Sequence, residues 1–163
     1  MAIRDPLTSL FNRYYMEETL EIEVERSKRS NKPIGIIMLD FDSFKELNTT
    51  FGHPYVDEML RDFGKLLTGA IRSSDVCCRY GGDEFLIILP ETTLETTIHR
   101  ANELRLRVKN LSVHKDESTM KVSISVGVAA FPNHGLEVTD LMRAVDAALL
   151  KAKERHDCTM VAE

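Results

Sequence analysis

The segment Arg79–Phe85 constrains the fold more than any other part of the chain, because it places an acidic turn between two apolar runs. The segment reads Arg-Tyr-Gly-Gly-Asp-Glu-Phe, and the runs Val76–Tyr80 and Phe85–Leu89 flank it. A Gly-Gly pair tolerates the positive φ angles that the favoured two-residue hairpin turns require. The sequence therefore predicts a β-hairpin that carries the carboxylates Asp83 and Glu84 at its tip.

A second acidic segment closes the most apolar run of the chain. Residues Ile34–Leu39 form a continuous run of the kind found in strands buried on both faces, and Asp40, Phe41 and Asp42 follow it directly. Acidic groups at the end of a core strand and on a hairpin suggest one shared site. The natural occupant of such a site is a hard divalent cation, because Mg²⁺ prefers oxygen ligands.

The remaining pattern alternates helices with strands. We expect helices over about 9–29 with Thr8 as N-cap, over 43–71 with an interruption at 52–54, over 94–111 and over 138–155, strands over 122–131 and 159–161, and a loop over 113–120. A hairpin requires an antiparallel pair, so the sheet is not purely parallel. The expected class is α/β (α+β), with helices packed on a mixed five-stranded sheet.

Length and composition exclude several classes of protein. The 163 residues fit a single domain, and 43% hydrophobic with 29% charged residues is an ordinary globular mixture. The net charge of −5 argues against a nucleic-acid-binding surface. No apolar run reaches the length of a membrane span, so we expect no membrane contact by this domain and a cytoplasmic location.

The segment Asp40–Lys45 also has features of a phosphate site. It opens a helix, whose first N–H groups lie at the positive end of the helix dipole, and Lys45 adds a cation. Taken alone, two aspartates after a strand are more often a helix cap. Together with the acidic hairpin they favour metal-assisted phosphoryl or nucleotidyl transfer.

Several ordered motifs give the chain a family resemblance. They are residues 5–13 (Asp-Pro-Leu-Thr-Ser-Leu-Phe-Asn-Arg), residues 40–48 (Asp-Phe-Asp-Ser-Phe-Lys-Glu-Leu-Asn), Gly52 with His53, Asp57, residues 79–85, residues 125–127 (Ser-Val-Gly) and residues 148–153 (Ala-Leu-Leu-Lys-Ala-Lys). Along nearly its whole length the chain resembles the GGDEF domain family, the diguanylate cyclases. The fold of that family resembles the nucleotide cyclases and the polymerase palm.

The resemblance implies a reaction and its partners. In the family, each domain binds one GTP, and two domains face each other in a transient homodimer. The 3′-OH of each GTP attacks the α-phosphate of the other, which gives cyclic di-GMP and pyrophosphate with Mg²⁺, or alternatively Mn²⁺, as cofactor. The resemblance also implies that residues 1–163 are one domain of a longer bacterial sensor protein.

The resemblance assigns roles to individual residues. The residues that match the metal ligands of the family are Asp40, the Phe41 carbonyl, Asp83 and Glu84. Those that match its catalytic residues are Lys45 and, as the base, Asp83 or Glu84. Those that match its substrate contacts are Phe44, Lys45, Asn48, His53, Asp57 and Lys153. In the family, the positions of Asn48 and Asp57 read guanine. That assignment has a physical basis, because a carboxylate accepts hydrogen bonds from guanine N1–H and N2–H₂, which adenine lacks.

Arg72 and Asp75 match the RxxD site through which cyclic di-GMP inhibits many family members. Arginine can stack on guanine and pair with phosphate, and aspartate can accept hydrogen bonds from the guanine edge. The alternative is a surface ion pair of little energetic value.

The chain departs from the family pattern at Thr49, Val56, Leu150 and the segment His156-Asp157. Asp157 stands where the family has an arginine that contacts the triphosphate, so an anion is expected to face the phosphates. The alternative function is therefore a catalytically weak or degenerate domain that binds GTP or cyclic di-GMP and signals through a partner.

Overall fold

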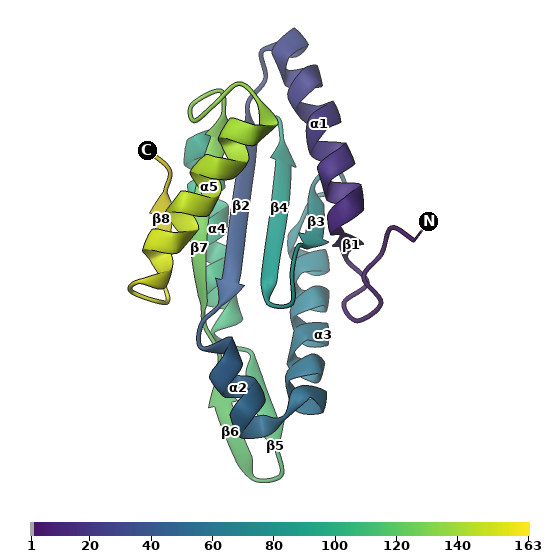
Figure 1. The fold of residues 1–163 in the computed structure, drawn as a ribbon, viewed down its shortest axis with the longest axis vertical. Helices are drawn as coiled ribbons and strands as arrows, with labels where there is room; N and C mark the ends of the chain where they lie inside the picture. Colours follow the sequence, from purple (N-terminus) through teal and green to yellow (C-terminus); the bar gives the residue numbers. More distant parts are fainter. Residues whose placement is uncertain (1) are drawn as a thin grey trace.

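The computed structural model describes residues 2–163 and is built around a mixed sheet (Figure 1). The sheet has six strands in the order β1 (Phe11–Asn12), β3 (Val76–Arg79), β4 (Glu84–Pro90), β2 (Ile34–Phe41), β7 (Ile124–Phe131) and β8 (Thr159–Val161). β2 is antiparallel to both β4 and β7, whereas β1 and β8 lie parallel to their neighbours. The predicted α/β class with a mixed sheet is confirmed. The sheet has one strand more than expected, because the two-residue β1 is too short to leave a sequence pattern.

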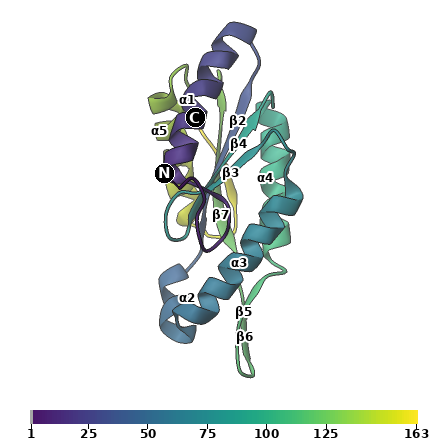
Figure 2. The same cartoon turned by 90° about the vertical axis from the view of Figure 1, so that its right-hand side faces the viewer.

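Helices cover both faces of the sheet. The helices are α1 (Arg13–Ser30), α2 (Phe44–Phe51), α3 (His53–Ala70), α4 (Leu94–Val108) and α5 (Val138–Lys153), and all but α2 lie on a face of the sheet (Figure 2). One core cluster joins the sheet to α3 and α4, and another joins it to α1 and α5. Figure 2 shows the sheet between these two helix layers, with α2 beyond one end of it. Among the described residues, no helix is long and apolar enough to cross a membrane.

The side chains of β2 alternate between the two helix layers, and this alternation decides which layer Asp40 faces. Ile37 and Leu39 pack in the cluster with α3 and α4, whereas Ile36 and Met38 pack in the cluster with α1 and α5. Successive side chains of a strand point to opposite faces. Asp40 therefore lies on the face covered by α5, at the end of the strand.

Gly127 allows α5 to approach the sheet closely. A Cβ atom at Gly127 would lie 2.6 Å from the carbonyl oxygen of Val145 and 2.6 Å from the backbone nitrogen of Leu149. Only glycine fits so close a backbone approach. This contact sets the depth of α5 against β7 and so helps to place the end of α5 beside the end of β2.

The N-terminal turn differs from the sequence prediction. α1 begins at Arg13 rather than near Ser9, and its N-cap is Asn12, whose side chain accepts a hydrogen bond from the Tyr15 N–H at 3.0 Å. Thr8 is not a helix cap: its N–H and hydroxyl donate to one carboxylate oxygen of Asp5 at 2.8 and 2.7 Å. Residues of β1 pair with β3 before the helix starts, which delays the start of α1.

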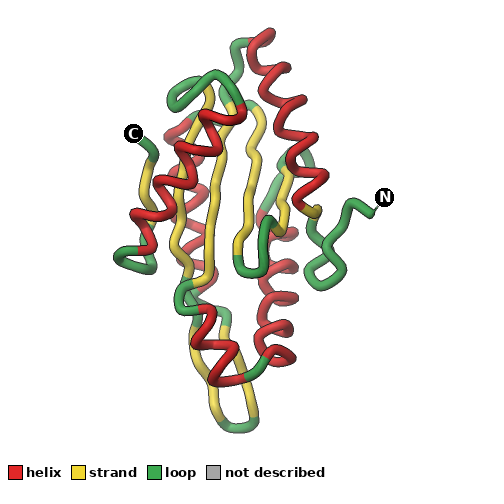
Figure 3. Tube along the Cα trace, viewed as in Figure 1, coloured by secondary structure: helices red, strands yellow, loops and turns green. Residues whose placement is uncertain are grey.

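The segment predicted to be a loop over 113–120 is a hairpin, so that prediction is wrong. β5 (Ser112–Lys115) pairs with β6 (Ser118–Lys121), and this two-stranded sheet extends beyond the main sheet (Figure 3). Val113 is fully buried and anchors the hairpin in the core. The Lys115 ammonium also lies 5.4 Å from the Tyr55 ring centroid on α3. The hairpin could not be predicted from the sequence, because β6 is exposed along its length and so lacks the alternation of apolar and polar residues that marks a half-buried strand.

Candidate active site

The two acidic segments meet at one end of the sheet, as predicted. Asp40 of β2 lies directly opposite Glu84 of β4 in the antiparallel register. Residues opposite each other in such a pair project from the same face of the sheet. The turn continues this contact, because the Phe41 N–H donates to the Asp83 carbonyl at 3.3 Å.

The acidic turn is wider than the predicted two-residue hairpin turn. The N–H groups of Tyr80 and Gly81 both donate to the Glu84 carbonyl, at 2.8 and 3.1 Å, and positive φ angles occur at neither Gly81 nor Gly82. The Arg79 side chain holds the loop by donating to the Gly82 carbonyl at 2.6 and 3.1 Å. A tertiary side-chain contact thus shapes the turn, which the Gly-Gly pattern alone did not reveal.

Asp40 is the most buried acidic group of this site. Its residue is 3% exposed, one carboxylate oxygen pairs with the Lys153 ammonium of α5, and the other, Oδ1, has no hydrogen-bond partner among the described residues. Burial and the nearby Asp83 carboxylate raise the pKa of Asp40, Lys153 lowers it, and the net result is a pKa of about 7. The hydrogen bond to Asp40 raises the pKa of Lys153 against the effect of its own burial.

These oxygen atoms fit a magnesium ion. An unpartnered buried carboxylate oxygen is costly unless a cation or a donor compensates it. The described residues form no ready cluster of three or more His, Cys, Asp or Glu ligands. Such a cluster is not required, because Mg²⁺ is usually held by one or two carboxylates together with substrate phosphates and water.

A cleft of about 540 Å³ opens beside the acidic turn. It is lined by Phe44, Lys45, Asn48, Thr49, His53 and Asp83. Its volume lies within the range of about 300–1,000 Å³ that is typical of small-molecule sites. The amide oxygen Oδ1 of Asn48 is buried and has no hydrogen-bond partner among the described residues.

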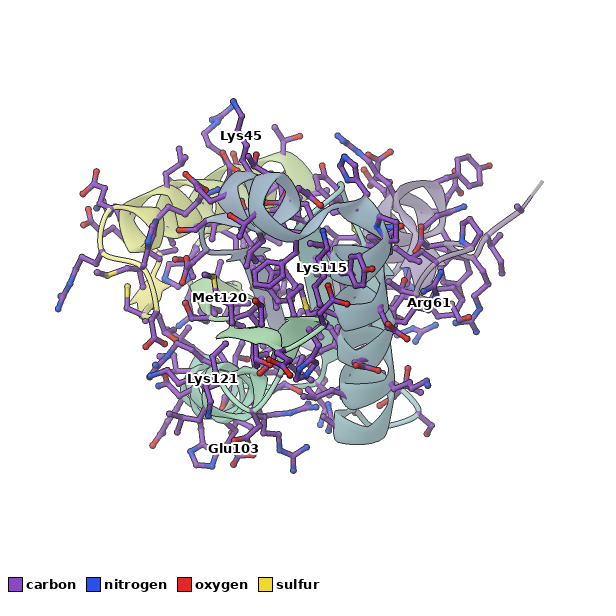
Figure 4. The ribbon with its side chains drawn as sticks, turned by 90° about the horizontal axis from the view of Figure 1, so that it is seen from below. Lys45, Arg61, Glu103, Lys115, Met120 and Lys121 are labelled. Carbon is purple, nitrogen blue, oxygen red and sulfur yellow. The ribbon has the colours of Figure 1, made fainter. Side chains whose placement is uncertain are left out.

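The start of α2 faces this cleft without a side-chain cap. Ser43 occupies the N-cap position with a φ of 54°, but its side chain makes no capping hydrogen bond. Asp42 does not cap the helix either: its carboxylate accepts hydrogen bonds from the hydroxyls of Ser123 and Ser125 at 2.6 and 2.5 Å. Lys45 lies exposed on the first turn, as Figure 4 shows from the end of the molecule that carries α2. The helix start therefore offers free N–H groups and a cation to an anion.

The structure brings most of the predicted substrate residues together but leaves Asp57 at the edge. His53 begins α3, and Asp57 follows one turn later, half-buried and outside the residues that line the cleft. Lys153 lies with Asp40 rather than in the cleft lining.

The predicted RxxD pair lies apart from the cleft and has partners that the sequence did not reveal. The Asp75 side chain is fully buried and pairs with Arg72 at 2.9 Å and with Arg100 of α4 at 2.9 Å. Arg72 also donates to the Thr92 hydroxyl at 2.9 Å. Burial alone would raise the pKa of Asp75, but the hydrogen bonds from Arg72 and Arg100 outweigh it and lower the pKa below its ordinary value.

Asp157 does not present a free anion to the phosphate site, contrary to the sequence expectation. Its carboxylate pairs with Arg105 of α4 at 3.0 Å and with Lys109, the residue directly after α4, at 2.5 Å. Burial alone would raise the pKa of Asp157, but hydrogen bonds from these two cations lower it. No local pattern announces the contact, because Asp157 and Arg105 are 52 residues apart.

A mixed α/β sheet with a buried carboxylate at the end of an inner strand, beside an uncapped helix start, has the chemistry that suits phosphate groups and a metal ion. A family model described as "Diguanylate cyclase, GGDEF domain" matches residues 2–158. The chain belongs to this family.

Known proteins support the assignment. The response regulator PleD of Caulobacter vibrioides is 36% identical over 155 residues, which is 94% of this chain and 34% of PleD. Diguanylate cyclase DosC of Escherichia coli is 36% identical over 152 residues, which is 93% of this chain and 33% of DosC. The chain thus spans about a third of the length of these curated relatives.

A solved structure extends the likeness to the whole fold. Diguanylate cyclase SiaD of Pseudomonas aeruginosa, solved with its activator SiaC, superposes with a TM-score of 0.92 at 36% identity, over 99% of this chain and 62% of SiaD.

Proposed function

We propose that the chain is a diguanylate cyclase domain that condenses two GTP molecules into cyclic di-GMP and two pyrophosphates. The observation that carries the proposal is the Asp40 carboxylate: it is buried, opposite Glu84, paired with Lys153, and keeps one oxygen without a partner. Family membership and relatives named diguanylate cyclases support the same reaction.

The acidic residues would hold the cofactor. Asp40, the Phe41 carbonyl, Asp83 and Glu84 are the proposed ligands of Mg²⁺, with Mn²⁺ as an alternative. When bound, the ion supplies positive charge at the triphosphate, where negative charge develops in the transition state. Asp83 or Glu84 accepts the proton of the 3′-OH. Lys45 and Lys153 bind the triphosphate, and the free N–H groups at the start of α2 contribute further donors.

The cleft would bind the nucleoside. Asn48 and Asp57 are the proposed guanine readers, with His53 beside them and Phe44 against the base. The support is the buried Asn48 oxygen, which has no partner among the residues described and needs a donor. Guanine offers N1–H and N2–H₂ at its edge, whereas adenine would leave such an acceptor unpaired.

Catalysis requires two copies of the domain. Each copy holds one GTP, so the 3′-OH of one substrate reaches the α-phosphate of the other only in an antiparallel homodimer. The product has a proposed second role as an inhibitor at Arg72 and Asp75. The half-exposed Arg72 guanidinium, held at the end of the buried Asp75, supports this role. The GGDEF domain of DgcB from Caulobacter crescentus, 25% identical, was solved in complex with cyclic di-GMP.

A product assay tests the proposal. The purified domain is incubated with Mg²⁺ and GTP, or with Mg²⁺ and ATP, and the products are identified by mass spectrometry. We expect cyclic di-GMP from GTP alone. The rival is a degenerate domain that binds nucleotide and signals through a partner. Asp157 favours this rival, because the resemblance to the family implies an arginine at that position. Binding of GTP or cyclic di-GMP without turnover would favour that rival.

A further inference from the structure

We infer that Asp157 is a positioning residue: its contacts with α4 and with Asp42 hold the last turn of α5, and hence Lys153, against Asp40. The inference deepens the proposed function, since Lys153 and Asp40 are proposed substrate and metal contacts. It concerns the segment 154–158, here named the C-terminal clasp, which connects α5 to β8.

The clasp first caps the end of α5. The Ala152 carbonyl accepts hydrogen bonds from the Arg155 and His156 N–H groups at 3.1 and 2.9 Å, and from the Cys158 thiol at 3.4 Å. Such bonds satisfy carbonyl groups that a helix end otherwise leaves unpaired. Lys153 is the neighbour of Ala152 and the last residue of α5, so the clasp sets the position from which the Lys153 side chain starts.

The clasp has a backbone conformation that requires support. His156 and Asp157 have φ angles of 63° and 46°. This left-handed region costs a residue with a Cβ atom about 1–2 kcal/mol, although aspartate tolerates it better than most. Contacts from the surrounding structure must therefore hold the segment in place.

Two cations at the C-terminal end of α4 supply the first contact: Arg105 in its last turn and Lys109 directly after it. Asp157 binds Arg105 and Lys109, and its own side chain is 32% exposed while that of Arg105 is 19% exposed. α4 packs on one face of the sheet and α5 on the other. The Asp157 carboxylate thus connects the two helix layers around the β8 edge.

Asp42 supplies the second contact. The Asp157 N–H donates to Asp42 Oδ2 at 2.9 Å, and the same carboxylate accepts from the hydroxyls of Ser123 and Ser125. Asp42 follows Asp40 by two residues. The clasp is therefore tied to the chain on both sides of the Asp40–Lys153 pair, through Asp42 on one side and through the end of α5 on the other.

Loss of the carboxylate would release this arrangement. Arg105 Nε is already buried without a partner among the described residues, so removing Asp157 would leave a partly buried guanidinium with fewer acceptors. An unpaired buried cation is unfavourable, and the side chain would turn toward water. The clasp would then lose its contact with α4. As a consequence, Lys153 would no longer be held in a fixed position.

A mutant cycle between Asp157 and Lys153 tests the inference. Asp157→Asn keeps the shape and tolerates the positive φ, and Lys153→Met removes the cation. Binding of Mg²⁺ with 3′-deoxy-GTP, which cannot condense, is measured by calorimetry. We expect Asp157→Asn to weaken binding about tenfold, about 1.4 kcal/mol, and Lys153→Met to weaken binding by a similar factor in the native background but little in the Asp157→Asn background. Additive effects, or unchanged binding in Asp157→Asn, would overturn the inference.

A matched control separates positioning from general loss of an ion pair. Lys151, on the last turn of α5, forms an exposed pair with Glu163, which follows β8; their side chains are 53% and 85% exposed. Glu163→Gln should leave binding and its coupling to Lys153 unchanged. Arg105→Met combined with Lys109→Met should reproduce the effect of Asp157→Asn.

Amide hydrogen exchange tests the clasp without any nucleotide. Asp157→Asn should speed exchange of the 153–158 amides at least about tenfold, while the amides of β2 and β4 keep their native rates. If the native domain binds no GTP, the proposed function fails and the exchange measurement alone decides the inference. If exchange becomes faster throughout the domain, or if the 153–158 amides keep their native rates, Asp157 does not position this segment.

Discussion

Asp40 and Glu84 lie directly opposite each other across the β2–β4 ladder, although 44 positions separate them in the chain, the difference between their residue numbers. The hairpin formed by β3 and β4 thereby delivers its acidic turn to the end of the most buried strand. Because opposite residues share a face, both carboxylates meet the same helix layer, which contributes Lys153. This pairing underlies the first prediction.

Asp40→Asn and Glu84→Gln should each abolish cyclic di-GMP formation while the domain stays folded. Each change keeps the shape of the side chain but removes a charge from the proposed metal site. Loss of metal stabilisation in the transition state should lower kcat by about a hundredfold or more, about 3 kcal/mol. Product formation is followed by chromatography and folding by circular dichroism. Glu18→Gln, an exposed change on α1, is the control, and native turnover in either site variant would contradict the proposed site.

Arg72→Ala should relieve inhibition by added cyclic di-GMP without lowering the initial rate. Arg72 is half-exposed and is not among the residues that line the cleft, so its loss removes a proposed ligand contact without removing any of the proposed reacting groups. Linkage requires that the variant also bind cyclic di-GMP more weakly, which calorimetry measures. Arg61→Ala on α3 is the control for charge. If native progress curves show no inhibition beyond substrate depletion, Arg72 and Asp75 are only a structural ion pair.

Asp75 should make the domain less stable in acid. Its pKa is lowered in the folded state, so its stabilising effect is fully present above the unfolded pKa and is lost as the pH falls through the folded pKa, below about pH 4. Asp75→Asn should destabilise the domain at pH 7 by about 1–3 kcal/mol.

Urea unfolding at pH 7 and pH 3 measures the effect. The difference in the free energy of unfolding between the native domain and Asp75→Asn should be smaller at pH 3 than at pH 7. Asp116→Asn, at an exposed turn, should show no such change. If the difference in unfolding free energy is the same at both pH values, Asp75 is not ionised in the folded domain.

Specific activity should rise with protein concentration. The reaction needs two domains in opposed orientation, so isolated copies depend on a diffusional encounter. Fusion to a dimerising coiled coil should raise the rate at fixed concentration, since it supplies a high effective concentration. Initial rates over a wide range of domain concentrations provide the measurement. Specific activity that does not depend on concentration would argue against catalysis in a transient dimer.

Local patterns in the sequence determined the main elements of this protein. The apolar run that became β2, the runs on either side of the acidic turn and the interruption at Gly52 were all readable, because strand burial and helix breaks depend on neighbouring residues. The prediction that the acidic segments meet also held, since a hairpin and a core strand leave few ways to assemble one sheet.

Only the tertiary structure decided the contacts that tune the site. Arg79 shapes the acidic turn without positive φ at either glycine, Arg100 reaches Asp75, and α4 neutralises Asp157. β1 and the β5–β6 hairpin likewise depend on their partners for stability. The physical reason is that a charge or a short strand gains its energy from groups distant in the chain. Composition and periodicity record what a residue is and which neighbours it has, but not which cation or strand the fold brings to it.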